Sequence, residues 1–118
     1  MTTFLGPHSE ADDHLDLLAS LGHDVRIVGP VSGGVDKATV LAAFAADLDL
    51  PDWFGHNWDA LLDALRDLDV PRGQTLELVW DHVGDLRRHD HDTYETVVDI
   101  LEQVQDERDD LRITVIAR

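Results

Sequence analysis

The chain has 118 residues, which is enough for one domain whose hydrophobic core needs no metal ion or disulfide to stabilise it. Its 25 acidic residues outnumber 9 Lys and Arg, and the formal net charge of −16 argues against direct binding to nucleic acid or to an anionic membrane. Cysteine is absent, which excludes disulfides, thiol nucleophiles and cysteine metal sites.

The excess of acidic residues has two interpretations. It favours a basic partner, and it is equally expected if the acidic charge merely keeps the protein soluble or reflects a salty cytoplasm. The amino terminus has neither a basic cluster nor a long apolar run, and no window of the sequence approaches a membrane span. We therefore expect a soluble cytoplasmic protein that binds no membrane.

The first 48 residues predict a helix, a strand and a second helix. Residues 9–21 predict a short helix, because an acidic first turn is followed by recurring leucines and a terminal glycine. This helix could pack on a sheet or support dimerisation. Residues 24–29 predict a strand that ends in a glycine-rich loop, and residues 37–48 predict a helix with Asp36 as its N-cap.

Residues 50–68, LPDWFGHNWDALLDALRDL, join an aromatic turn to a short amphipathic helix. Pro51 and Gly55 indicate the turn, and Asn57 is a typical N-cap, so the helix should begin near Trp58. At helical spacing, one arc of the helix is apolar and contains Trp58, Leu61, Leu62, Leu65 and Leu68. The opposite arc contains Asp59, Asp63, Arg66 and Asp67. Its first two carboxylates lie at i and i+4, where like charges repel by about 0.2–0.5 kcal/mol unless positive charge meets them.

The remaining chain continues the alternation of strands and helices. Residues 75–80 predict a buried strand, residues 82–88 a short helix, residues 93–107 a longer helix, and residues 112–117 a last strand. Strands separated by helices are typical of a parallel sheet. The sequence therefore predicts an α/β fold in which helices pack on a small three-stranded parallel sheet.

The three tryptophans have different expected environments. Trp80 closes an apolar strand, so we expect it in the core. Trp58 lies in the middle of the apolar arc, which also favours the core. Trp53 lies in the turn, outside every periodic stripe and close to a glycine, which favours an exposed position at an interface.

The 50–68 segment resembles the barstar family, the intracellular inhibitors of barnase-type ribonucleases. The residues that carry the resemblance are Leu50, Pro51, Trp53, Phe54, Gly55, Asn57, Asp59, Ala60, Leu61 and Asp63. A weaker resemblance extends over residues 23–118, where strands and helices occur in the order of the family. This resemblance implies a barstar-like inhibitor domain over 23–118, with residues 1–22 as an amino-terminal extension.

The resemblance also implies a function and a site. A protein of this family blocks the basic active site of a ribonuclease with the acidic helix and the preceding loop, and it needs no cofactor. The central contact would be Asp63, an established hot spot of the family, with Asp59 beside it and Trp53 in the loop. The implied partner-binding residues are Trp53, Gly55, His56, Asn57, Asp59, Leu62, Asp63 and Gln103.

Three of these positions depart from the best-known member of the family. His56 replaces a glutamate, Leu62 replaces an aromatic residue, and Gln103 stands where a later helix provides an acidic contact, with Glu102 next to it. The partner could therefore be a related basic ribonuclease or another basic toxin. In the second case the chain would be an immunity protein or an acidic binding module that inhibits no ribonuclease.

Two other functions can be built from the sequence. His56 with the two helix aspartates could serve as an acid/base pair or hold a divalent cation, but no Lys or Arg cluster accompanies them. The histidines and aspartates of residues 87–92, RRHDHD, could bind zinc, although they lack the regular spacing of a structural site. We expect a solvated loop at 87–92, no metal site and no enzymatic activity.

Overall fold

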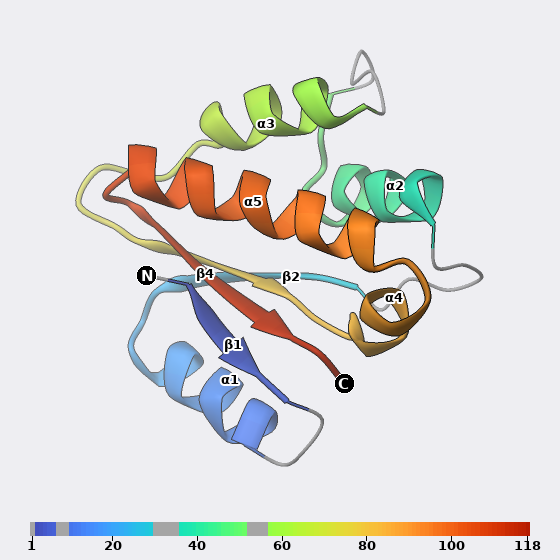
Figure 1. The fold of residues 1–118 in the computed structure, drawn as a ribbon. Helices are drawn as coiled ribbons and strands as arrows, with labels where there is room; N and C mark the ends of the chain where they lie inside the picture. Colours follow the sequence, from blue (N-terminus) through green and yellow to red (C-terminus); the bar gives the residue numbers. More distant parts are fainter. Residues whose placement is uncertain (1, 7–9, 30–35, 52–56) are drawn as a thin grey trace.

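The computed structural model describes residues 2–6, 10–29, 36–51 and 57–118. These residues form four strands and five helices (Figure 1). In chain order, the elements are β1 (Thr3–Leu5), α1 (Glu10–Ser20), β2 (Asp24–Val28), α2 (Lys37–Asp47), α3 (Trp58–Arg66), β3 (Leu76–Trp80), α4 (Gly84–His89), α5 (His91–Glu107) and β4 (Leu111–Ile116). No helix in this described part of the chain is long and apolar enough to cross a membrane.

The strands form one parallel sheet in the order β1-β4-β3-β2. The predicted α/β class and the parallel sheet are confirmed, and the predicted count of three strands is wrong. The fourth strand is β1, which pairs with β4 at the edge of the sheet, Thr3 opposite Thr114 and Leu5 opposite Ile116. A strand of three residues is too short to produce a periodic sequence pattern, so β1 can be recognised only from its pairing with β4.

Helices cover both faces of the sheet (Figure 1). Helix α1 lies on one face, and α2, α3 and α5 lie on the other. The connection through α1 carries the chain from the β1 edge to the β2 edge, and the later connections carry it back. Right-handed crossovers that run in opposite directions must lie on opposite faces, which explains the two helical layers.

The main core lies between the sheet and helices α2, α3 and α5. Trp80 is fully buried there, with its ring centroid 5.9 Å from that of Phe44 and 5.8 Å from that of Tyr94, so the prediction for this tryptophan is confirmed. Trp58 is only half-buried at the margin of the core, where the ammonium group of Lys37 lies 5.1 Å from its ring centroid.

A second, smaller core lies under α1. Ala11 and Leu18 of this helix pack with Val79 of β3 and Ile116 of β4. The sequence left open whether the helix predicted at residues 9–21 packs on the sheet, and the structure shows that α1 does. The division of the chain at residue 22 stays a prediction.

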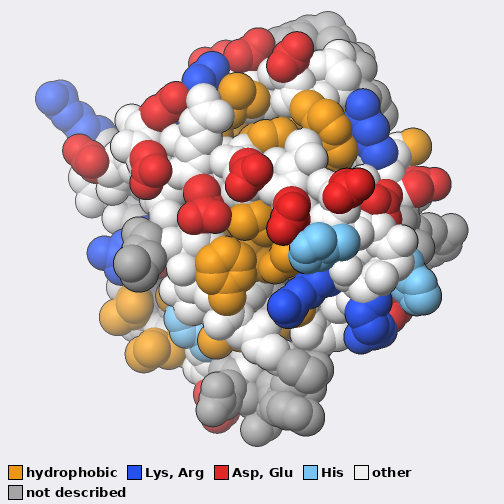
Figure 2. Space-filling view, viewed as in Figure 1, with side chains coloured by type: hydrophobic (Ala, Val, Ile, Leu, Met, Phe, Trp, Pro, Cys, Tyr) orange, Lys and Arg blue, Asp and Glu red, His pale blue; other side chains and the backbone are white. Residues whose placement is uncertain are grey.

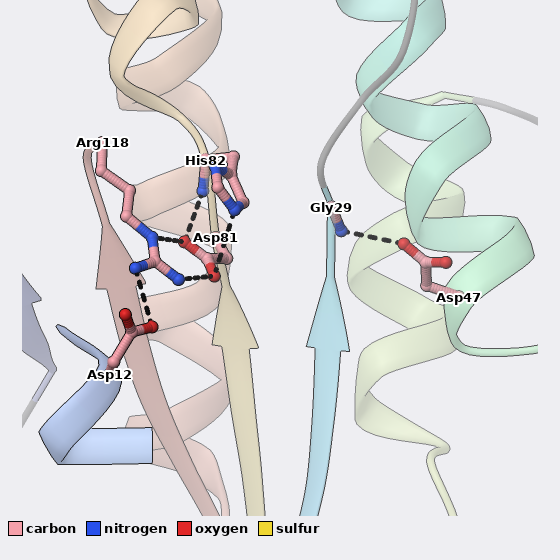
Figure 3. A network of polar contacts seen from close by, with 6 residues as sticks. All are labelled: Asp12, Gly29, Asp47, Asp81, His82 and Arg118. Atoms are coloured by element: carbon pink, nitrogen blue, oxygen red, sulfur yellow. Dashed lines mark hydrogen bonds and ion pairs between the residues drawn. The ribbon is translucent and has the colours of Figure 1, made fainter. Parts of the chain in front are cut away.

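An ion-pair network ties the carboxyl terminus to β3 and α1 (Figure 3). The guanidinium of Arg118 donates two hydrogen bonds to the carboxylate of Asp81, at 3.0 and 2.9 Å, and one to Asp12 at 2.9 Å. Asp81 is almost fully buried and also accepts a hydrogen bond from the backbone N–H of His82. These contacts raise the pKa of Arg118 above its usual value, so its guanidinium remains charged.

The structure contradicts the solvated loop predicted at residues 87–92. Helix α4 runs to His89 and α5 begins at His91, with only Asp90 between them. Asp90 caps α5 through the backbone N–H of Thr93, which is why the second helix begins at once. Among the described residues, no group of three or more His, Asp or Glu side chains could hold a metal ion.

The end of β2 depends on Gly29. Its φ is +106°, and its N–H donates a 2.9 Å hydrogen bond to Asp47 at the end of α2 (Figure 3). A Cβ atom on this residue would lie 2.5 Å from the backbone oxygen of Asp81. A side chain here would therefore face both backbone strain and a collision with main-chain atoms.

We expect Gly29→Ala to reduce the free energy of unfolding by at least ~2 kcal/mol, since both costs apply together. Gly73→Ala is the matched control, because Gly73 also has a positive φ, +83°, but its Cβ would meet no atom within 4 Å. The control should lose only about 1 kcal/mol. Urea unfolding of the two variants measures both losses. Equal losses of unfolding free energy would show that a collision with the backbone oxygen of Asp81 does not contribute.

Candidate partner-binding surface

Helix α3 begins where the sequence predicted. Asn57 precedes the helix with extended backbone angles, and its side-chain oxygen accepts a 2.8 Å hydrogen bond from the backbone N–H of Ala60. This N-cap satisfies one of the donors that every helix start leaves without an intrahelical partner. The predicted N-cap and the predicted first residue, Trp58, are both confirmed.

The two faces of α3 have opposite environments. Leu61 and Leu65 are fully buried in the main core, and Leu62 packs half-buried at its margin. Asp59 and Asp63 are exposed, and the side chain of Asp63 keeps 73% of its accessible surface. The carboxylates are therefore a surface feature and take no part in the core.

Helix α5 extends this acidic surface, because α3 packs beside it (Figure 1). Figure 2 shows acidic side chains gathered across the face that α3 and α5 present to solvent. The exposed acidic residues on and next to the two helices are Asp59, Asp63, Asp67, Asp92, Glu95, Asp99, Glu102, Asp106 and Glu107. We call this set the acidic surface.

Arg108 holds the carboxyl-terminal end of α3 in place. It donates hydrogen bonds to the backbone oxygens of Leu65 and Leu68, at 2.9 and 2.8 Å, from just beyond the end of α5. Its Nε and Nη2 atoms also bond the carboxylate of Asp110, which lowers the pKa of Asp110. A half-buried guanidinium thus donates to backbone oxygens at and just beyond the end of the helix, where the regular helical hydrogen bonds stop.

Arg66 is the cation within the acidic surface. Its Nε and Nη2 atoms donate to the two carboxylate oxygens of Glu107, at 2.7 and 2.8 Å, and its Nη1 atom lies 3.7 Å from Asp63. This bidentate contact raises the pKa of Arg66 and lowers that of Glu107. Gln103 also donates to Glu107, at 3.4 Å, so four residues form one polar cluster.

The structure brings together most of the predicted site residues that it describes. Asn57, Asp59 and Asp63 follow one another along α3, and Gln103 lies on the neighbouring α5, four residues before Glu107. The predicted residues Trp53, Gly55 and His56 lie outside the described part of the chain.

Sequence reasoning put Arg66 in the polar arc of the helix without giving it a role, and it did not consider Arg108. The spacing of Arg66 from Asp63, i and i+3, is a signal that could have been used. The contacts of Arg66 with Glu107 and of Arg108 with α3 span about 40 residues of sequence, and no local pattern predicts them.

A comparison with family models gives one match, to the family described as Barstar (barnase inhibitor), over residues 30–117. The match spans about three quarters of the chain and includes α2, α3, α5 and strands β3 and β4. No curated protein matches the chain. The chain belongs to the barstar family, a family of inhibitors by its description.

The exposure of Asp63 leads to a stability prediction. Asp63→Ala should change the free energy of unfolding by less than ~0.5 kcal/mol, because the lost contact with Arg66 is solvent-exposed and a repulsion from Asp59 is lost with it. Asn57→Ala, which removes the N-cap of the same helix, should cost about 1 kcal/mol. Thermal unfolding compares the two; a loss from Asp63→Ala as large as that from Asn57→Ala would make the carboxylate structural.

Proposed function

We propose that this protein inhibits a basic, barnase-type ribonuclease by covering its active site with α3 and the loop before it. The observation that carries the proposal is the pair of exposed carboxylates, Asp59 and Asp63, on a helix that is capped and anchored at both ends. Membership of an inhibitor family supports the same function. The protein would act in the cytoplasm of the cell that makes it.

Carboxylates suit this task because a ribonuclease binds RNA through its phosphates. A cleft that binds phosphates presents arginine, lysine and protonated histidine side chains, and an inhibitor can occupy it by putting carboxylates in the positions of the phosphates. Asp63 would take the central position and Asp59 the adjoining one. Bidentate, charge-assisted hydrogen bonds inside a cleft that excludes water are the strongest polar contacts available.

The other predicted contacts would surround this pair. Trp53, Gly55 and His56 would contact the partner from the loop, while Leu62 and Gln103 would contact it from α3 and α5. The anchoring of α3 supports high affinity, since a helix that is already ordered loses little conformational entropy on binding. The long, exposed series of acidic residues on α5 would contribute chiefly to the speed of association.

A second candidate is binding of another basic toxin by the same surface. It is favoured by His56 and Leu62, which differ from the best-known family member, because a change of contact residues is how related interfaces change partner. The protein would then be an immunity protein whose partner is not a ribonuclease. Inhibition assays with basic ribonucleases distinguish the two candidates.

Asp63→Ala should weaken ribonuclease binding by at least ~2 kcal/mol, because a central, desolvated charge dominates interfaces of this kind. Asp59→Ala should also cost substantially, and Trp53→Ala somewhat less. The measurement is inhibition of the ribonuclease, with Asp67→Ala as a control at the rim and Asp13→Ala as a control on α1, across the sheet. If Asp63→Ala inhibits as well as the natural chain does, the active-site-blocking mechanism is wrong.

Association should depend strongly on salt. The net charge of −16 and the acidic surface would attract a basic partner from a distance at low ionic strength, where the Debye length reaches about 30 Å. Raising the salt concentration should therefore slow association much more than it speeds dissociation. Stopped-flow association rates measured between low and high salt check this, and a rate that stays flat would exclude electrostatic steering.

A further inference from the structure

Arg66 sits in the acidic surface where a basic cleft would bind. Its side chain is 39% exposed, and it lies between Asp63 on its own helix and Glu107 on α5. Two of its three nitrogens are occupied by Glu107. The third, Nη1, is 3.7 Å from Asp63, which is too long for a hydrogen bond, and it makes no hydrogen bond to any other described residue.

This arrangement alters what a partner would meet. Any cation that binds Asp63 must approach to within a few ångströms of a guanidinium that cannot lose its charge. Glu107 is already paired and offers the partner little net charge. The central part of the surface is therefore a carboxylate beside a cation, within a wider region that is acidic.

We propose that Arg66 is a specificity-determining residue, and that the partner places a carboxylate opposite it, beside the cationic group that binds Asp63. This inference rests on the function proposed above. The Nη1 atom of Arg66 lies next to the carboxylate of Asp63. A partner that presents a carboxylate to Arg66 and a cationic group to Asp63 would form charge-assisted hydrogen bonds with both residues. A cleft that is basic throughout would leave the guanidinium facing like charge, so Arg66 would select against it.

Barnase is a suitable probe, as a ribonuclease of the class whose cleft is basic. Arg66→Gln should tighten binding to barnase by about tenfold at low salt, because it removes the repulsive cation. Glu107→Gln should weaken binding, because it removes the pairing carboxylate and leaves Arg66 with its full charge. If Arg66 served only to join α3 to α5, both variants would break the same contact and change binding in the same direction.

Matched controls separate this local effect from net charge. Arg112→Gln makes the same change at an exposed arginine on the other face of the sheet, and Asp13→Asn neutralises an exposed carboxylate on α1, outside the acidic surface. Each control should alter the dissociation constant less than about threefold. Thermal unfolding of all four variants should remain close to that of the natural chain, since exposed ion pairs contribute little stability.

The outcomes distinguish this inference from the proposed function. Opposite shifts for Arg66→Gln and Glu107→Gln, both beyond their controls, would support it, whether or not the natural chain itself binds barnase tightly. Inhibition by the natural chain with no gain in Arg66→Gln over Arg112→Gln would overturn it and leave the proposed function intact. No inhibition of barnase or other basic ribonucleases by any variant would overturn both.

Discussion

The burial of β3 on both faces is the constraint on which the rest of this structure depends. All five residues from Leu76 to Trp80 are buried, so neither face of the sheet can be left to solvent. One of them is Glu77, whose side-chain oxygen lies 2.9 Å from Nδ1 of His23, so this buried polar group has a hydrogen-bond partner. Helix α1 covers one face of the sheet, and helices α2, α3 and α5 cover the other.

Helix α1 and the acidic surface lie on opposite sides of the sheet. The family match begins at residue 30, so β1 and α1 lie outside it, yet they contribute a strand and the second core. Because α1 is across the sheet from α3, this unit completes the fold without covering the acidic surface (Figure 1). Arg118 binds Asp12 of α1 and Asp81 after β3, and these ion pairs join α1 to the carboxyl terminus of the chain.

The acidic surface combines rigidity with a charge distribution that is not uniform. Asn57 fixes the beginning of α3, and Arg108 fixes its end by binding backbone oxygens, so the carboxylates between them have defined positions. Rigidity favours binding because less entropy is lost on association. Arg66 relieves part of the repulsion among neighbouring carboxylates, and the same cation limits the set of clefts that can bind there.

The sequence by itself determined the features that depend on neighbouring residues. Apolar spacing gave every helix and three of the four strands, cap chemistry gave the starts of α2 and α3 at Asp36 and Asn57, and helical periodicity put Asp59 and Asp63 on the solvent side of α3. Only the tertiary structure decided the pairing of β1 and the contacts of Arg66 with Glu107 and of Arg108 with the end of α3. Each long-range contact joins residues that are distant in sequence, as Arg66 and Glu107 are, at a separation of 41 residues. Such contacts form only once the helices have packed, and no local pattern encodes them.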